Sequence, residues 1–194
     1  MIETKEELRD FLQFEKELYC PSTDKVHNIL AILKGELKIY RWPYIRNLRK
    51  AEYYYYRRNK NPCYFILYTW YLRKKNRLGL KLGMDIKEYV FDKGLLIHHA
   101  SGIVVNGCAK VGKNCVLHGN NVIGNMGENT GTPTIGDNVR LGIGAKVLGD
   151  IYIADGVQIG AGALVIHSCY EEGALLVGVP AVIKNKNEND EVQK

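Results

Sequence analysis

A six-residue period between Val105 and Val165 constrains the fold of this chain more than any other feature of its sequence. Ten branched aliphatic residues recur at this interval with one interruption: Val105, Val111, Leu117, Ile123, Ile135, Leu141, Val147, Ile153, Ile159 and Val165. Six steps of about 100° would scatter these side chains around a helix, whereas an even period keeps them on one face of a strand. The period therefore predicts a series of short strands that share an inward face.

Small residues accompany this period and indicate a tight coil. The residues two positions before the aliphatic ones are mostly small or apolar and point the same way: Ala109, Cys115, Val139, Ala145, Ile151, Val157 and Ala163. Glycine follows the aliphatic residue at positions 112, 124, 136, 142 and 160, where it fits a bend. Hexapeptide repetition of this kind is typical of a parallel β-helix. Ordinary strands with chance glycines are the alternative, and ten aliphatic residues in phase argue against it.

The first 84 residues have a helical period instead. Helices are predicted at residues 5–19, at 22–35 with Ser22 or Thr23 as N-cap, at about 44–60 and at about 62–82. The sequence thus predicts an α+β fold class with three parts: an α-helical domain at 1–84, a β-helix domain at 85–184 and a disordered tail at 185–194.

Composition predicts a globular, soluble protein. Of the 194 residues, 46% are hydrophobic, which is enough for a core. The longest apolar run, residues 63–72, is too short to span a bilayer, and the acidic N-terminus does not resemble a signal peptide. The five cysteines form no CxxC pair, which fits reduced thiols. A cytoplasmic location is therefore expected.

Residues 34–81 are strongly basic and aromatic. They contain fourteen Lys or Arg and two Glu, which gives a net charge near +12 while the whole chain carries +6. One interpretation is a surface that contacts an anionic membrane, at its inner face, or an anionic substrate. The other is a set of helices that pack tyrosine rings inward and keep solvated charges outside. Nucleic-acid binding is not predicted, because no nucleic-acid motif is visible.

An ordered set of motifs in residues 85–184 resembles the serine acetyltransferase family. It consists of an Asp85-Ile86 pair, a His99-Ala-Ser-Gly-Ile-Val-Val105 block, the hexapeptides, a 142–149 segment and Gly178-Val-Pro-Ala181. The resemblance implies a left-handed β-helix, a handedness that no general rule would have given. It also implies a homotrimer with acetyl-CoA in a groove between subunits and without a metal.

By the same resemblance His99 is the catalytic base and Asp85 orients it. A neutral imidazole can take the proton of a hydroxyl group as its oxygen attacks a thioester, then return that proton to the thiolate. A carboxylate on the other ring nitrogen would fix the tautomer. A structural histidine at a corner is the alternative for His99.

The resemblance also names residues for the cosubstrate. Lys184 would face its phosphate charge, and the remaining cofactor-binding candidates are glycines and alanines: Gly124, Gly144, Ala145, Gly160, Ala161 and Gly162. Their alternative role is that of simple corner residues.

Two departures from the family concern the acceptor. His98 stands where serine acetyltransferases carry an acidic residue, and the sequence Gly131-Thr132-Pro133 replaces their second histidine before a proline. The basic helices resemble relatives that acetylate sugars of capsules and exopolysaccharides. A sugar hydroxyl is therefore the favoured acceptor and L-serine the alternative, with His98, His118 and Thr132 as candidate acceptor contacts.

Three other functional classes stay open. A metal hydratase on this fold would need three converging histidines, and the histidines at 98/99, 118 and 167 lack the expected spacing. A cysteine acyl-enzyme would need an activated thiol, whereas Cys115 and Cys108 are expected to lie in the packed repeat. A β-helix that only mediates assembly would not bind acetyl-CoA.

Overall fold

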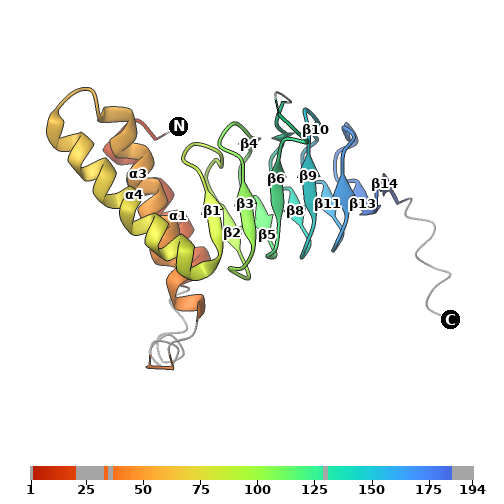
Figure 1. Ribbon diagram of the computed structural model, residues 1–194, viewed down its shortest axis with the longest axis horizontal. Helices are drawn as coiled ribbons and strands as arrows, with labels where there is room; N and C mark the ends of the chain where they lie inside the picture. Colours follow the sequence, from red (N-terminus) through yellow and green to blue (C-terminus); the bar gives the residue numbers. More distant parts are fainter. Residues whose placement is uncertain (1, 21–32, 35–36, 129–130, 185–194) are drawn as a thin grey trace.

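The computed structural model describes residues 2–20, 33–34, 37–128 and 131–184 of the chain. Helices occupy one end of the elongated molecule, and β coils stack along its long axis toward the other end (Figure 1). The predicted disordered tail at 185–194 and most of the predicted helix at 22–35 lie outside the described residues.

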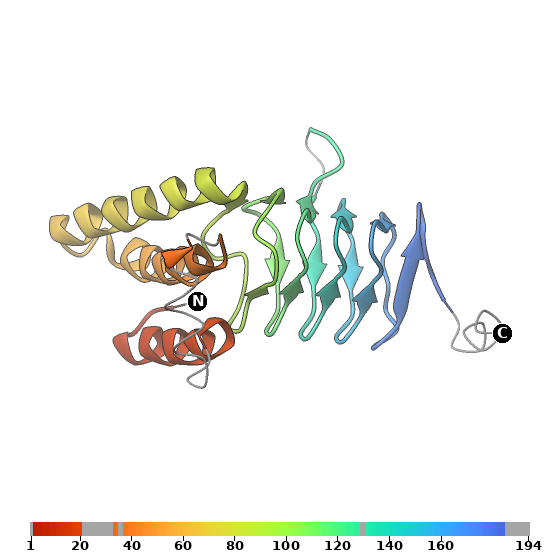
Figure 2. The same ribbon diagram turned by 90° about the horizontal axis from the view of Figure 1, so that it is seen from below.

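The helical end is built from α1 (Lys5–Tyr19), the 3-10 helix η2 (Leu37–Tyr40), α3 (Arg41–Arg57) and α4 (Pro62–Leu82). Helix α3 packs against both α1 and α4 (Figure 2). It begins and ends about three residues before its predicted bounds. The earlier start is possible because Pro43 falls in the first turn, where its missing N–H has no helical acceptor.

Local sequence sets the ends of these helices. The Thr4 hydroxyl accepts the Glu7 N–H at 3.1 Å, and the Glu7 carboxylate accepts the Thr4 N–H at 3.0 Å, which is a capping box. Asn61 caps α4 by accepting the N–H of Cys63 at 2.8 Å. Gly83 ends α4 in the left-handed conformation, with φ 67°, and β1 begins at the next residue.

From Met84 onward the chain forms a parallel β-helix of three sheets. Sheet A contains β1 (Met84–Ile86), β3 (Ile103–Val105), β6 (Val122–Gly124), β9 (Lys146–Leu148) and β12 (Leu164–Val165). Sheet B contains β4 (Lys110–Val111), β7 (Thr134–Ile135) and β10 (Tyr152–Ile153). Sheet C contains β2 (Leu96–Ile97), β5 (Val116–Leu117), β8 (Arg140–Leu141), β11 (Gln158–Ile159), β13 (Leu175–Gly178) and β14 (Ala181–Ile183).

The six-residue period forms the core of the β-helix. All ten of its aliphatic residues are at most 4% exposed, and the small residues two positions earlier are buried with them. Parallel pairing stacks each inward residue on its counterpart, so that Val105 lies beside Ile123 and Ile123 beside Val147. The prediction of an inward face made of short strands is confirmed.

Strand β14 ends the series of coils in a different direction. It pairs antiparallel with β13, with Leu176 opposite Ile183 and Gly178 opposite Ala181. The last strand of sheet C therefore folds back on its neighbour, while the helices cover the opposite end of the β-helix (Figure 1).

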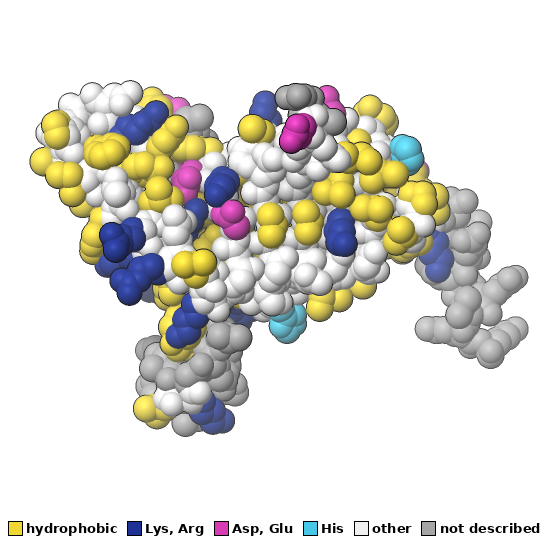
Figure 3. Space-filling view, in the orientation of Figure 1, with side chains coloured by type: hydrophobic (Ala, Val, Ile, Leu, Met, Phe, Trp, Pro, Cys, Tyr) yellow, Lys and Arg dark blue, Asp and Glu magenta, His cyan; other side chains and the backbone are white. Residues whose placement is uncertain are grey.

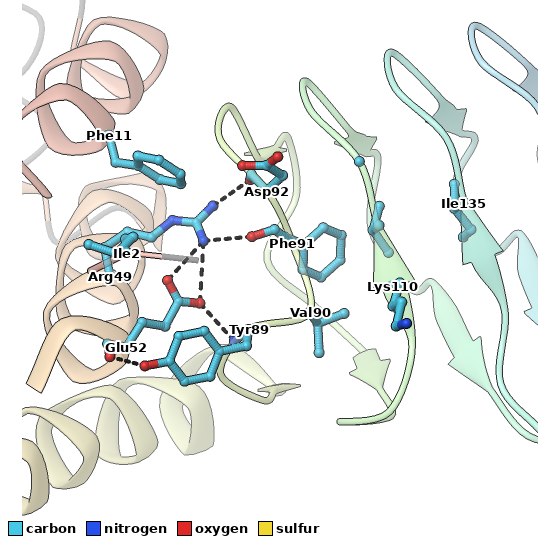
Figure 4. A pocket seen from close by; sticks show the side chains of 12 residues that line it. Ile2, Phe11, Arg49, Glu52, Tyr89, Val90, Phe91, Asp92, Lys110 and Ile135 are labelled. Atoms are coloured by element: carbon cyan, nitrogen blue, oxygen red, sulfur yellow. Dashed lines mark hydrogen bonds and ion pairs between the residues drawn. The ribbon is translucent and has the colours of Figure 1, made fainter. Parts of the chain in front are cut away.

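A buried ion triad joins the helices to the first coil. Arg49 on α3 is fully buried and lies 2.7 Å from a carboxylate oxygen of Glu15 and 3.0 Å from one of Glu52. Its guanidinium also donates to the carbonyls of Phe91 and Asp92, both at 2.8 Å (Figure 4). Because donors and acceptors come from α1, α3 and the coil before β2, the triad fixes the helices against the β-helix.

The basic stretch places many of its cations on aromatic rings. Lys74 Nζ lies 3.3 Å from the ring centroid of Trp70, and the Arg58 guanidinium lies 3.6 Å from that of Tyr55. Helix α4 nevertheless exposes apolar side chains, among them Phe65 and Leu80. Figure 3 shows hydrophobic side chains next to Lys and Arg side chains over the helical end. Inward packing of tyrosines alone does not account for this surface. None of the described helices has both the length and the apolar content needed to cross a bilayer.

Candidate active site

One corner of the β-helix, where sheet C leads into sheet A, carries most of the residues that the sequence singles out. Successive coils form it from residues 98–102, 118–121, 142–145 and 160–163. Backbone hydrogen bonds keep the coils in register: the Gly144 N–H donates to the Gly119 carbonyl at 2.9 Å, and the Gly162 N–H to the Ile143 carbonyl at 2.8 Å. We call this surface the corner column.

His99 stands exposed in the first coil of the corner column. Its carbonyl accepts the N–H of Ser101 at 3.1 Å. In the next coil Gly119 has a φ of 116°, and a Cβ at this position would lie 2.8 Å from the His99 carbonyl oxygen. Glycine therefore allows the second coil to close against His99. An exposed imidazole at this place is accessible to a substrate and can act as a general base.

The rings of His98 and His118 lie next to each other in neighbouring coils, in a tilted arrangement. Their ring centroids are 4.7 Å apart, with 31° between the ring planes. Arg41, the first residue of α3, donates from Nη1 to the Ile97 carbonyl at 3.0 Å and also to the His98 carbonyl. Helix α3 thus places a guanidinium against the backbone carbonyls of Ile97 and His98.

The surroundings of His98 disfavour its protonated form. Partial desolvation lowers the pKa of His98, and its electrostatic interactions with the neighbouring His118, Arg41, His99 and Arg140 lower it further. Arg140 belongs to β8 and is exposed. The guanidinium groups of Arg41 on α3 and Arg140 on β8 therefore make the electrostatic environment of His98 positive.

A buried asparagine braces the corner column. Asn121 is fully buried, and its side-chain oxygen accepts the Gly119 N–H at 2.9 Å. Its amide donates to the carbonyls of Gly142 at 2.7 Å and Ala145 at 3.2 Å in the following coil. One side chain thus links two coils beside the candidate site.

The Asn121→Ala change is expected to lower the free energy of unfolding by about 1–3 kcal/mol, because the buried Gly119 N–H loses its acceptor. Urea unfolding followed by circular dichroism measures this loss. The matched control is Asn125→Ala, an exposed asparagine, whose effect should stay within about 0.5 kcal/mol. Equal losses in the two variants would contradict the bracing role.

The later coils of the corner column hold most of the predicted cofactor residues. Gly144, Gly160, Ala161 and Gly162 lie there at the surface, whereas Ala145 is buried and faces the core. Within the described residues, the N–H groups of Ile143 and Ala161 donate to no protein acceptor. These two donors are in line along the column and are available to the amide groups of an extended ligand.

Asp85 lies apart from His99. It projects from β1 in sheet A, where its carboxylate oxygens are 3.1 and 3.2 Å from Lys87 Nζ, and it lines a cavity of about 480 Å³ beside α4. No hydrogen bond joins Asp85 to His99 in the described part of the chain, since Asp85 lies on β1 beside Val104 of β3, whereas His99 lies in the bend that precedes β3. The orienting role of Asp85 stays a prediction.

Three further predicted residues also lie away from the corner column. Gly124 ends β6 and Thr132 precedes β7, so both lie at the opposite edge of sheet A. Lys184 donates its N–H to the Leu175 carbonyl at the start of β13, the end of that strand remote from Gly178. A single protomer does not bring these three residues to His99.

The thiols differ from each other. Cys115 is buried, and burial raises its pKa to about 12, which keeps it protonated and unreactive. Cys108 is exposed, contrary to the expectation that it lies in the packed repeat. The inward positions of this coil belong to Ala109 and Val111, so alternation along the strand turns residue 108 outward.

Across the described ranges, no three His, Cys, Asp or Glu side chains are grouped so as to hold a metal ion.

Sequence reasoning missed four residues of this surface. Arg140 and Ile143 could have been found, because they stand at outward positions next to the inward Leu141 and at the corner that follows. Asn121 gave no signal beyond its place in a corner. Arg41 gave none at all, since its contacts with Ile97 and His98 join residues 56 and 57 positions apart.

Comparison with protein families and curated proteins points to one group. Residues 132–167 match the family model described as bacterial transferase hexapeptide (six repeats). Serine acetyltransferase 1, chloroplastic, of Arabidopsis thaliana is 39% identical over 83 residues, which cover 41% of this chain and 26% of that protein. The serine acetyltransferase of Synechococcus elongatus is 40% identical over 63 residues, or 31% of this chain and 26% of that protein. The matched part thus spans about a quarter of each relative.

Solved structures extend the similarity to nearly the whole chain. Serine acetyltransferase from Brucella abortus strain S19 superposes with a TM-score of 0.69 at 21% identity, covering 93% of this chain and 71% of that one. The Neisseria gonorrhoeae enzyme in complex with serine gives 0.67 at 24% identity, with 93% and 70% covered. A serine acetyltransferase in complex with CoA gives 0.65 at 23% identity, with 93% and 71% covered. The chain therefore has the fold of the serine acetyltransferases, an N-terminal helical region followed by a left-handed β-helix of hexapeptide repeats, as the sequence predicts.

Proposed function

We propose that the protein transfers the acetyl group of acetyl-CoA to a hydroxyl acceptor, with His99 as the general base. The observation that carries this proposal is the corner column, in which an exposed imidazole stands in line with the N–H donors of Ile143 and Ala161. The similarity to serine acetyltransferases over the repeats supports it.

The chemistry requires little more than positioning. The His99 imidazole takes the hydroxyl proton as the acceptor oxygen bonds to the thioester carbonyl carbon. The C–S bond then breaks, and the proton passes from the imidazolium to the departing thiolate, which leaves an acetate ester and CoA. Backbone N–H groups along the groove are suited to bind amide carbonyls of the extended cosubstrate and to hold the thioester near the base.

L-Serine is the acceptor that the names of the relatives support. These relatives give no support to a sugar acceptor, which the sequence alone had favoured. A hydroxyl acceptor other than L-serine is a second candidate, because His98, and not a carboxylate, precedes His99 and lies in positive surroundings.

A homotrimer belongs to the proposal. Val104 on sheet A is 50% exposed and Ile143 on the corner column is 55% exposed, so apolar side chains face outward on both sides of the same edge. Contact between protomers at this edge would bury them and enclose the thioester.

The Ala161→Trp change is expected to abolish acetyl-CoA binding, because the indole would fill the surface over which the cosubstrate extends. Isothermal titration calorimetry measures the binding, and sedimentation velocity on the same samples measures the mass of the assembly. Glu172→Trp, an exposed substitution at another corner, should leave both unchanged. Absence of acetyl-CoA binding by the unmodified protein would overturn the proposal, and a monomer would overturn the trimer.

A further inference from the structure

One side of helix α4 exposes large apolar side chains, although the opposite side of the helix is packed. Phe65, Ile66 and Trp70 are 56, 65 and 48% exposed, whereas Gly79 and Leu82 of the same helix are buried. Helix α4 packs on α3, which also packs on α1, so α4 is an outer helix of the helical end (Figure 2). Three large apolar side chains thus face away from the rest of the protomer.

Exposed cations follow these apolar side chains along α4. Arg73, Lys74 and Arg77 are exposed, and residues 53–84 contain no Asp or Glu. Across the described residues, none of these three cations lies in an ion pair. We call six residues of α4 the basic apolar face: Phe65, Ile66, Trp70, Arg73, Lys74 and Arg77.

We propose that the basic apolar face docks on an anionic membrane surface, with its cations on the lipid phosphates and its apolar side chains below them. A helix that carries cations and apolar side chains on its exposed side lies in the plane of the interface, where the apolar side chains enter the boundary between headgroups and acyl chains. Juxtaposed cations add electrostatic attraction to acidic lipids. This inference goes beyond the proposed acetyl transfer and does not depend on it.

Trp70 lies between the apolar and the basic part of this face. The centroid of its ring is 3.3 Å from Lys74 Nζ, and the ring packs edge-on against Tyr71. Tyr71 in turn stacks on Tyr54 of α3, with 5.4 Å between ring centroids, so the indole has a packed support. Tryptophan is enriched at membrane interfaces, because its ring is apolar while its N–H bonds to headgroups or water. A cation held against such a ring lies at the depth of the lipid phosphates.

Charge favours a membrane over a second copy of the chain as the partner of this face. Two basic apolar faces in contact would bring like charges together, and residues 53–84 supply no carboxylate to pair with them. A nucleic acid would neutralise the cations and still leave Ile66 in water. An anionic lipid surface satisfies both parts of the face, since it offers phosphates and acyl chains side by side.

The position of the apolar part keeps it apart from the contact proposed for the trimer. That contact is at Val104 and Ile143 on the β-helix, and α4 reaches the β-helix at Leu82. With a rise of 1.5 Å per residue, Phe65 lies about 25 Å before that end of the helix. The same surface therefore need not serve both purposes.

Co-sedimentation with lipid vesicles tests the proposal. Phosphatidylcholine vesicles that contain about 30% phosphatidylglycerol should bind the protein at least about 10-fold more strongly than vesicles of phosphatidylcholine alone. Raising the salt concentration from about 0.1 M to about 1 M should weaken this binding, because it screens the charges. Equal binding to the two kinds of vesicle would overturn the proposal.

Two variants locate the contact on α4. Arg73→Glu should weaken binding to the anionic vesicles by at least about 10-fold, whereas Lys113→Glu, the same change at an exposed site of the β-helix, should not. Phe65→Ser should weaken it by at least about 5-fold, because an apolar ring no longer enters the lipid. Its control is Tyr170→Ser, which removes a ring that is 76% exposed on the β-helix. Losses as large in the controls would contradict a specific face.

Tryptophan fluorescence tests whether the apolar side chains enter the lipid. The chain has two tryptophans, so Trp42→Phe leaves Trp70 as the single reporter. Anionic vesicles should shift its emission to shorter wavelength, and lipids brominated on their acyl chains should quench it. Vesicle binding without quenching would reject docking through the apolar side chains. A lower assembly mass of Phe65→Ser in sedimentation velocity, with vesicle binding unchanged, would assign the face to a contact between copies instead.

Discussion

His99→Ala is expected to reduce kcat for thiol release from acetyl-CoA by about 10²–10⁴-fold, the contribution usual for a positioned general base. An alcohol is a poor nucleophile while it keeps its proton, and the exposed His99 imidazole is the group placed to remove it. Acetyl-CoA binding should be almost unchanged, because the donors for the cosubstrate lie in later coils. Steady-state kinetics and calorimetry measure the two effects separately.

The matched control for His99→Ala is His118→Ala, one coil further along the corner column. The His118 ring lies beside the His98 ring in a tilted arrangement, and its removal should affect the KM of the acceptor more than kcat. If His118→Ala lost kcat while His99→Ala kept its activity, His118 and not His99 would be the general base. Equal loss of acetyl-CoA binding in both would indicate damage to the fold.

Arg49→Ala is expected to lower the free energy of unfolding by about 3–5 kcal/mol, because it leaves two buried carboxylates without a counter-charge. Glu15 and Glu52 are almost fully inaccessible to water, and the carbonyls of Phe91 and Asp92 lose a donor as well. Urea unfolding at pH 7 measures the loss. Burial raises the pKa of Glu52, and without the opposing charge of Arg49 that pKa rises further. The loss should therefore shrink as the pH falls and the Glu52 carboxylate is neutralised in the folded state.

The control for Arg49→Ala is Lys93→Ala, which breaks a more exposed ion pair with Asp10. Its effect should be at most about 1 kcal/mol. If Arg49→Ala cost no more than Lys93→Ala, the triad would not hold the helices against the first coil.

The β-helix could be predicted closely because its information is local. An even period needs only the alternation of side chains, so residues such as Leu117 and Ile159 were assigned to the core from spacing alone. The same spacing brings Gly144 and Gly162 to one corner. The bounds predicted for α4, residues 62 and 82, are also the observed ones, and Asn61 and Gly83 cap this helix.

The contacts that complete the candidate site could not be predicted in this way. Arg41 and Arg49 reach the first coil across more than 40 positions, and no periodicity relates a helix to the strand on which it packs. A family resemblance also assigns roles to residues without saying on which sheet or at which corner those residues lie. Gly124 and Lys184 match motifs, yet they lie at edges remote from the corner column, since a linear motif does not state which corner each residue occupies.

The antiparallel strand β14 has a consequence for how molecules meet in solution. A stack of parallel coils would present open strand edges at its last turn, a template on which another molecule could continue the same sheet. Because β14 reverses direction on β13, the end of sheet C no longer offers the parallel pattern that a further coil would need. The helices occupy the other end of the stack (Figure 1). Growth of these coils into an end-to-end fibre is thereby opposed by the chain itself, at the end of sheet C and at the helical end.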